Sequence, residues 1–248
     1  MKKRFEKIAL DKFFHKIGEN LPEKTTVYLL GGGAMCFRDQ KNTTKDLDLL
    51  FKDTKSHNKF IKNLRDLNFK KQDSVLGVYS NMEANSIWDH TSGFRLDLFV
   101  GSVCNRLFLS ANMIKRSKLL KQYGNLRVYI MSNEDIILLK AVTERIDDTA
   151  DIASIVHSTE INWEIILGEC EVQSKNRAWY SELLNKFYEL KESFDINPPI
   201  IPKIERLYQN ALIKNKINEL KHKGYSKEQI EKELKERGFT DTEIEHAF

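Results

Sequence analysis

The chain has 248 residues, of which 41% are hydrophobic and 31% are charged, and its formal net charge is +4 at pH 7. This length allows one large domain or two modest ones, and the ordinary apolar fraction excludes a wholly disordered chain. No apolar run approaches the roughly 18 residues that span a bilayer, and so small a net charge does not by itself indicate a nucleic-acid partner.

The cysteine pattern indicates the redox state of the cellular compartment in which the protein is expected. Cys36, Cys104 and Cys170 lie far apart and fit neither a disulfide framework nor a zinc site. The basic start of the chain leads into an amphipathic stretch that contains acidic residues, which is unlike a signal peptide. We therefore expect reduced thiols and a cytoplasmic protein with no membrane segment.

The first 130 residues are expected to mix helices and strands. Hydrophobic periodicity predicts helices over residues 3–18 and 55–67 and strands over residues 26–30, 47–51, 75–79, 85–90, 94–100 and 126–130. One face of the first helix is expected to be apolar, formed by Phe5, Ile8, Ala9, Phe13 and Ile17. The capping-box pattern Ser132-Asn133-Glu134-Asp135 then predicts a helix as far as Arg145.

From Asp151 onward the sequence predicts helices alone. Residues 195–202 contain three prolines and break the helical pattern. Residues 224–230 return 14 residues later as residues 238–244, and each copy has a helix-ending Gly followed by a Ser or Thr cap. We therefore predict an α+β fold with a catalytic domain at 1–158 and a helical C-terminal region at 159–248, in which 203–248 is an accessory unit.

The chemically informative segment runs from Gly31 to Asp48. A strand ends at Gly31-Gly32-Gly33, so that backbone N–H groups and a helix N-terminus can approach a phosphate closely. The chain then returns to a strand that carries Asp46 and Asp48 on one face. Two adjacent carboxylates repel each other, and a divalent cation relieves that repulsion.

Asp97 is the candidate third carboxylate. It lies in the otherwise apolar strand of residues 94–99, where an uncompensated charge would be costly. Each feature has a structural alternative: a βα turn is often glycine-rich, Asp-x-Asp is common on solvated strands, and Asp97 could pair with a nearby Arg. The order in which all three occur favours a metal site over those alternatives.

This order of motifs resembles the DNA polymerase β superfamily of nucleotidyltransferases. The pattern of Lys140, Arg145, Asp148 and Asp151 further resembles small prokaryotic and archaeal members, including the AbiE-type toxin nucleotidyltransferases. The resemblance covers roughly residues 26–156. It implies a mixed sheet with flanking helices, a nucleoside triphosphate substrate and two Mg²⁺ or Mn²⁺ ions.

The resemblance also implies roles for individual residues. Asp46, Asp48 and Asp97 would bind the metal ions and form the catalytic centre, with Asp97 as the base if one is needed. The nucleotide would be bound by Gly32, Gly33, Thr44 and Lys140, with Arg38, Arg145, Asp148 and Asp151 as supporting residues. Gly33 departs from the Ser or Thr that many members have, which removes one phosphate contact.

The acceptor is less well defined by the sequence. Residues 98–133 contain no acidic residue, and their basic side chains are Arg106, Lys115, Arg116, Lys118, Lys121 and Arg127. This segment is either an RNA-guiding surface or an ordinary solvated face. We expect RNA, especially a tRNA 3′ end, in a toxin–antitoxin setting. The alternatives are a protein or small-molecule hydroxyl, or an inactive nucleotide-binding module, and the C-terminal helices could bind a partner or a second copy.

Overall fold

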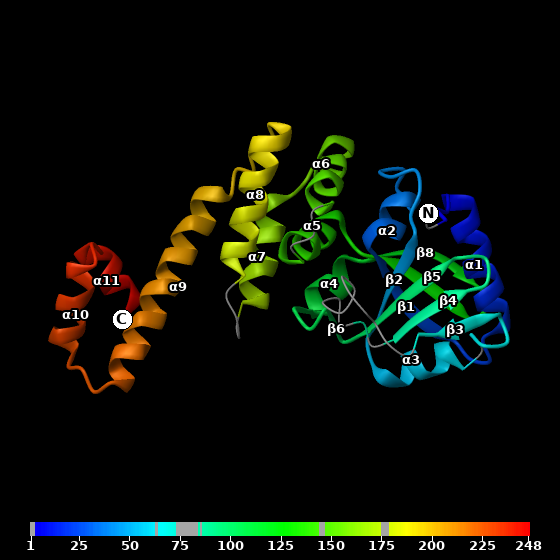
Figure 1. The fold of residues 1–248 in the computed structure, drawn as a ribbon, viewed down its shortest axis with the longest axis horizontal. Helices are drawn as coiled ribbons and strands as arrows, with labels where there is room; N and C mark the ends of the chain where they lie inside the picture. Colours follow the sequence, from blue (N-terminus) through cyan, green and yellow to red (C-terminus); the bar gives the residue numbers. More distant parts are fainter. Residues whose placement is uncertain (1–2, 63, 73–83, 85, 144–146, 175–178) are drawn as a thin grey trace. The chain divides into compact units, whose positions relative to one another are not determined.

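The computed structural model describes residues 3–62, 64–72, 84, 86–143, 147–174 and 179–248. Contacts divide the chain into two compact units, Met1–Glu169 and Cys170–Phe248. The first unit holds the strands, and the second is helical (Figure 1). The fold is therefore α+β, with a mixed sheet followed by helices, as the sequence predicts. The predicted boundary after residue 158 stays a prediction.

The first unit is built on a seven-stranded sheet in the order β3-β4-β5-β2-β1-β9-β8. Its strands are β1 Thr25–Leu30, β2 Asp46–Phe51, β3 Phe69–Lys71, β4 Ser86–His90, β5 Arg95–Val100, β8 Lys118–Tyr123 and β9 Leu126–Ile130. The β2–β5 and β1–β9 pairs are parallel, and the other pairs are antiparallel. The short strands β6 Ser102–Val103 and β7 Leu107–Phe108 form a separate hairpin.

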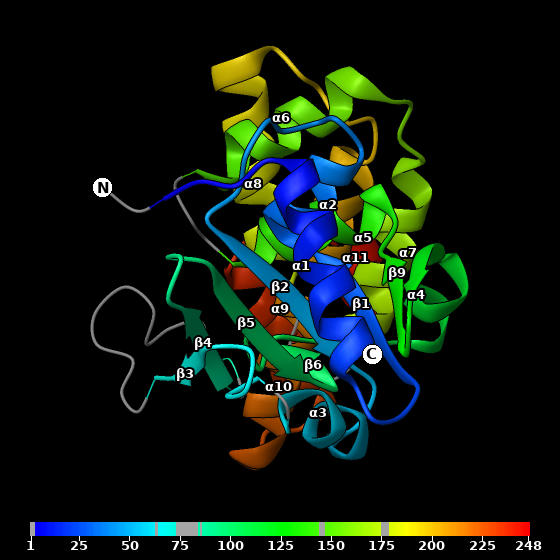
Figure 2. The same cartoon turned by 90° about the vertical axis from the view of Figure 1, so that its right-hand side faces the viewer.

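The helices of this unit are α1 Lys7–Asn20, α2 Gly31–Phe37, α3 Thr54–Ile61, α4 Ala111–Arg116, α5 Asn133–Val142, α6 Asp148–Ser158 and α7 Trp163–Gln173, the last of which crosses the boundary between the units. Helices α1 and α2 pack on each other, with α1 against β8 and β9 and α2 against β1 and β2 (Figure 2). Among the described residues, no helix is both long and apolar enough to cross a membrane.

The structure corrects the first predicted helix. Helix α1 begins at Lys7, and Phe5 instead pairs through its backbone with Thr44. The buried face of α1 is formed by Leu10, Phe14, Ile17 and Gly18, whereas Ile8 is 68% exposed. Of the predicted face, Phe5 and Ile17 are buried and Phe13 stacks on Phe94, so Ile8 is the member that the structure exposes. The prediction missed Leu10 and Phe14 because apolar residues lie on two sides of this helix. Strands β3 and β8 and helix α4 were not predicted, and the predicted strand 75–79 lies outside the described residues.

The second unit contains α8 Tyr180–Phe194, α9 Ile201–His222, α10 Lys227–Glu236 and α11 Asp241–Ala247. The predicted repeat is confirmed: Ser226 and Thr240 cap α10 and α11 in full capping boxes with Gln229 and Glu243. Helices α9–α11 have a small core of their own, made of Ile213, Ile217, Leu220, Ile230, Leu234, Ile244 and Ala247. Burial of these apolar side chains stabilises the corner between the helices.

Candidate active site

The glycine turn, Gly31–Gly33, is the first turn of α2 and follows β1 directly, and the side chains that it faces limit its space. Gly31 has φ +60°, and a Cβ added there would lie 2.0 Å from Asp48 Oδ2. A Cβ added to Gly32 would lie 2.6 Å from Thr44 Oγ1. Any larger residue at either position would displace a predicted site residue, so the glycines are required by close approach and not only by the turn.

Gly33 has a packing explanation. A Cβ at this position would lie 2.5 Å from Leu47 Cδ2, inside the core beneath the turn. The Ser or Thr expected from the resemblance therefore has no room while Leu47 keeps this position. The turn offers backbone groups and the N-terminus of α2 to a phosphate, in agreement with the chemistry predicted for a glycine-rich loop.

Three predicted carboxylates share one face of two neighbouring strands. In the parallel β2–β5 pair, Asp48 is the direct partner of Asp97 and Asp46 is the partner of Arg95. Side chains two residues apart on a strand point to the same face, so Asp46 and Asp48 lie beside Arg95 and Asp97. Asp48 and Asp97 are 8% and 0% exposed. This places two buried carboxylates side by side next to the glycine turn.

Each carboxylate also has neighbours in the protein. Arg95 Nε donates to Asp97 Oδ1 at 2.6 Å, so the ion pair considered from the sequence is present. Thr44 Oγ1 lies 3.1 Å from the Asp46 carbonyl oxygen and 3.4 Å from Asp46 Oδ1. In the described part of the chain, no three His, Cys, Asp or Glu side chains converge closely enough to hold a metal ion.

The residues nevertheless fit a divalent cation in type and position. Carboxylate oxygens are the ligands that Mg²⁺ prefers, and the strand register brings Asp46, Asp48 and Asp97 to one face. Ligation by all three requires rotation of side chains and no shift of the strand register. The three predicted metal ligands are thus brought together by the backbone, and their roles stay a prediction.

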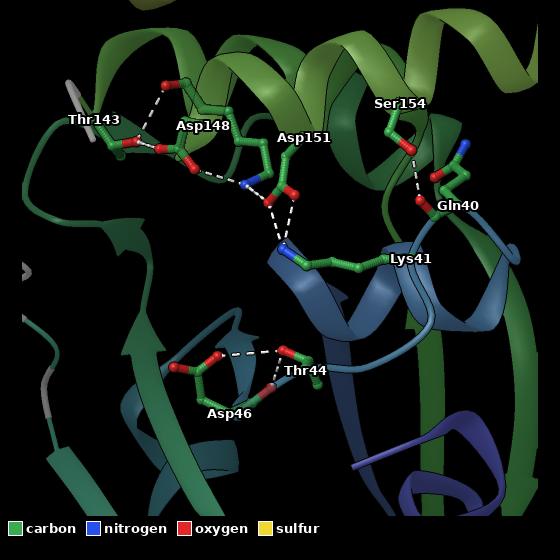
Figure 3. Close-up of polar contacts among 9 residues, drawn as sticks. Gln40, Lys41, Thr44, Asp46, Thr143, Asp148, Asp151 and Ser154 are labelled. Carbon is green, nitrogen blue, oxygen red and sulfur yellow. Dashed lines mark hydrogen bonds and ion pairs between the residues drawn. The ribbon is translucent and has the colours of Figure 1, made fainter. Parts of the chain in front are cut away.

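Lys140 forms a buried ionic network with its predicted partners Asp148 and Asp151, which are labelled in Figure 3. Its Nζ donates to Asp148 Oδ1 at 2.6 Å and to Asp151 Oδ2 at 2.7 Å. Thr143 Oγ1 also donates to Asp148, at 2.7 Å. Burial alone would lower the pKa of Lys140, but the two carboxylates outweigh it and raise the pKa. The expected contact of both aspartates with Lys140 is present, whereas contact of Lys140 with a phosphate is untested.

Arg38 has a different position from the carboxylates. Its Nη2 donates to the carbonyl oxygen of Met131, which follows β9. Burial lowers the pKa of Arg38 to about 10, against the opposing effect of Glu134 and Asp135. Arg38 therefore links the end of α2 to the segment before α5, and its supporting role remains predicted. Arg145 lies outside the described residues.

Sequence reasoning missed Lys41 and the specific pairing of Arg95. Lys41 Nζ contacts both oxygens of Asp151, at 2.7 and 2.9 Å (Figure 3). The available signal for Lys41 was a basic residue between the glycine turn and the Asp-x-Asp strand. The signal for Arg95 was its spacing of two residues from Asp97, which puts both side chains on one strand face.

The acid-free segment does not act as one basic surface. Arg116 Nη2 donates to Asp135 Oδ1 at 2.5 Å and to Glu169 Oε2 at 2.6 Å, and both acceptors are buried. Arg106 Nη1 donates to the Val142 carbonyl oxygen at 2.5 Å. Of the predicted basic set, the exposed members are Lys115, Lys118, Lys121 and Arg127. Arg116 is thus a structural cation and is excluded from the predicted RNA-guiding set.

A mixed sheet that presents paired aspartates beside a glycine turn is the arrangement that the resemblance to nucleotidyltransferases implies. Residues 7–195 match the family described as nucleotidyltransferase of unknown function (DUF6036). This match covers most of the chain, and the chain therefore belongs to that family and is a nucleotidyltransferase. A comparison with curated proteins finds no match.

Two solved structures are similar to the chain at low identity. One is the lincosamide antibiotic adenylyltransferase LnuA bound to lincomycin, with 18% identity, a TM-score of 0.40, and coverage of 61% of this chain and 94% of that chain. The other is a proposed nucleotidyltransferase from H. pylori, with 13% identity, a TM-score of 0.38, and coverage of 75% of this chain and 83% of that chain.

Proposed function

We propose that this nucleotidyltransferase moves a nucleoside monophosphate from a nucleoside triphosphate to an acceptor hydroxyl, with Asp46, Asp48 and Asp97 as ligands of two Mg²⁺ ions. The observation that carries the proposal is the register pairing of Asp48 with Asp97 beside Gly31. Arg95 offsets part of the charge of Asp97, and a divalent ion would offset the repulsion between the two carboxylates.

Each group of site residues has a separate task in the proposed reaction. The Gly31–Gly33 turn binds the triphosphate through backbone N–H groups, and Thr44 holds Asp46 in the adjoining turn. Bound Mg²⁺ would lower the pKa of the acceptor hydroxyl and stabilise charge on the leaving pyrophosphate. Asp97, on the strand next to Asp48, accepts the hydroxyl proton if a base is needed, while Arg95 stays beside it. The protein contributes mainly by positioning the two reactants.

RNA is the acceptor we propose, with a tRNA 3′ end as the first choice and a toxin-like role. The supporting observation is that Lys115, Lys118, Lys121 and Arg127 are exposed in a segment without acidic residues. Such side chains can neutralise a phosphate backbone. A protein or small-molecule hydroxyl is the competing acceptor, and an inactive nucleotide-binding module is the competing function.

Incubation with each labelled nucleoside triphosphate, Mg²⁺, total RNA and total protein tests these alternatives. We expect label in RNA when metal is present and none after addition of a chelator. Label in protein, or only in a small-molecule fraction, would overturn the RNA assignment and keep nucleotidyl transfer. Nucleotide binding without label in any fraction would favour the inactive module.

Salt dependence provides a second test of the acceptor. If RNA is bound by exposed cations, the KM for RNA should rise steeply with salt because counterions are released on binding. Lys115→Glu with Lys118→Glu should raise this KM and leave the KM for nucleotide unchanged. Arg116 is excluded from the variant because its reversal would break the contacts with Asp135 and Glu169. A flat salt profile would argue against RNA.

The C-terminal helices have a separate proposed role. Helices α9–α11 contain a small core and, among their described residues, no group resembling the aspartates of the first unit. We expect this accessory unit to recruit the acceptor, a partner protein or a second copy of the chain. Truncation after Ile201 separates these roles: a change in mass by light scattering indicates assembly, and selective loss of acceptor use indicates recruitment.

A further inference from the structure

Lys41 lies on the loop that joins the glycine turn to the Asp46 strand. The backbone on both sides of it is fixed. Ser154 Oγ donates to the Gln40 carbonyl oxygen at 2.6 Å, and Thr44 exchanges backbone hydrogen bonds of 2.8 and 3.0 Å with Phe5. Along the chain, Lys41 lies between the predicted phosphate turn and the predicted metal ligands.

The two lysines that share Asp151 differ in access. The Lys41 side chain is 31% exposed, whereas the Lys140 side chain is 10% exposed. Lys41 reaches Asp151 from the loop (Figure 3). Lys140 reaches Asp151 from α5. A solvent-accessible ammonium on a flexible stem can exchange one anion for another at little cost, which a buried one cannot do.

The consequences of removing each lysine are also unequal. If Lys41 leaves Asp151, that carboxylate still has its 2.7 Å contact with Lys140. If Lys140 leaves, Asp148 and Asp151 both lose a short ionic contact, and Asp148 is only 4% exposed. A buried carboxylate without its counter-ion is strongly unfavourable. The network therefore permits movement of Lys41 and opposes movement of Lys140.

We infer that Lys41 binds the phosphates of the nucleoside triphosphate by exchanging Asp151 for a phosphate oxygen, while Lys140 remains the buried counter-ion of Asp148 and Asp151. This inference rests on the proposed function and replaces Lys140 as the nucleotide-binding lysine. The exchange transfers no proton, because an ammonium pairs with an anion before and after it. Asp151 becomes a positioning residue that holds Lys41 near the turn before nucleotide binds.

Calorimetry with a non-hydrolysable nucleoside triphosphate analogue and Mg²⁺ tests the inference on the full chain. Lys41→Met should weaken binding by about tenfold or more, which is the loss of one charge-assisted hydrogen bond. Lys45→Met is the matched control, because Lys45 is an exposed lysine of the same loop, and it should bind like the wild type. Lys41→Arg should restore part of the affinity.

Two further readouts distinguish binding from a purely structural role. The thermal midpoint of Lys41→Met should stay close to that of the wild type, whereas Lys140→Met should lower it. The analogue affinity of the wild type should fall more steeply with salt than that of Lys41→Met, because one screened ion pair is missing from the variant. Lys41→Gln replaces Lys41→Met if the latter does not fold.

Unchanged analogue affinity in Lys41→Met would overturn the inference while the proposed function stands. Loss of affinity in a folded Lys140→Met, without loss in Lys41→Met, would restore the phosphate role to Lys140. If the wild-type chain binds no triphosphate analogue with Mg²⁺, the proposed function itself fails, and the assignment of Lys41 fails with it.

Discussion

The glycines and ion pairs of the Gly31–Asp151 region differ from those of α9–α11. Gly31 meets the Asp48 carboxylate, whereas Gly224 and Gly238 have φ of +83° and +92° and nothing within 4 Å of an added Cβ. Asp97, Asp148 and Lys140 are buried, whereas the lysine–glutamate pairs within α9 and α10 are exposed to a large extent.

The two regions therefore use glycine and charge for different purposes, one for the predicted site and the other for chain geometry. A glycine that ends a helix is required only for the backbone conformation at that position, and a surface ion pair contributes little to stability. A glycine that makes room for a carboxylate, or a charge buried with its partner, constrains several elements at once. Substitutions of the same kind in the two regions should therefore have very different effects.

Asp48→Asn should have the largest effect on activity. It removes the charge of a predicted metal ligand and keeps the side-chain shape, so transfer should fall by about 10²-fold or more, as for loss of a preorganised electrostatic group. Steady-state rates with labelled nucleotide measure this loss. Asp241→Asn on α11 is the control and should keep full activity, and a near wild-type rate in Asp48→Asn would refute the metal assignment.

Arg116→Met should have the largest effect on stability. It leaves Asp135 and Glu169, which are 0% and 1% exposed at the side chain, without their shared cation. Breaking such a buried pair costs about 3 kcal/mol of unfolding free energy. Urea unfolding measures the change. Arg237→Met removes the exposed pair with Glu233 and should leave the midpoint unchanged, and equal losses would contradict the contrast between the regions.

Gly31→Ala should destabilise the first unit by about 2–5 kcal/mol. A left-handed alanine costs about 1–2 kcal/mol, and overpacking against Asp48 adds about 1–3 kcal/mol. Gly238→Ala carries the backbone cost alone, because nothing lies within 4 Å of its added Cβ. Comparison of the two variants by thermal unfolding isolates the cost of the contact with Asp48. Equal losses of unfolding free energy in the two variants would show that this contact adds no cost.

Several parts of the site could be predicted from the sequence because they depend on local pattern. Side chains along a strand alternate between its two faces, which predicts that Asp46 and Asp48 lie on one face. The run of glycines predicts the turn. Parallel pairing of β2 with β5 was not encoded locally, yet it makes Asp48 and Asp97 direct partners. The sequence offers Asp97 as a candidate because a lone carboxylate in an apolar strand is costly, and the resemblance supports it. Neither gives its register with Asp48 or identifies Arg95 as the nearby Arg with which it pairs.

Other parts could not be predicted because they depend on tertiary contact. Arg116 and Lys115 are neighbours in sequence and look equally basic, but only Arg116 is paired with Asp135 and Glu169. Ile8 looks like a core residue and is 68% exposed. The capping boxes of α10 and α11 were predicted correctly because a cap is formed within four residues.

Acid titration of stability should distinguish a buried, ion-paired carboxylate, Asp151, from an exposed one, Glu219. Burial would raise the pKa of Asp151, but Lys140 and Lys41 outweigh it and lower the pKa below its ordinary value of 3.8. The folded state then binds fewer protons than the unfolded state, so this stabilisation is present above pH 3.8 and is lost as the pH falls through the folded pKa.

The stability difference between the wild type and Asp151→Asn should therefore be constant near neutral pH and shrink in acid. Glu219 is the control, because it also forms ion pairs with two lysines, Lys216 and Lys223, but lies exposed on α9. Solvent and salt screen those pairs. Glu219→Gln should follow the wild-type acid profile, and a difference as large as that of Asp151→Asn would contradict the argument.

Ser226→Ala should have the smallest effect and should be confined to the C-terminal helices. Ser226 Oγ accepts from Gln229 N at 3.3 Å, and Gln229 Oε1 accepts from Ser226 N at 2.8 Å. Loss of an N-cap costs about 1 kcal/mol, and the remaining Gln229 contact and solvent access limit the damage. Hydrogen exchange of α10 amides should accelerate, while exchange in β1, β2 and β5 stays unchanged.

Ser226→Thr keeps a capping hydroxyl and should restore protection. Transfer activity should be unaffected by either variant, because the cap serves the geometry of a helix end; a loss of activity in Ser226→Ala that Ser226→Thr restores would show that the local order of α10 is needed for the reaction.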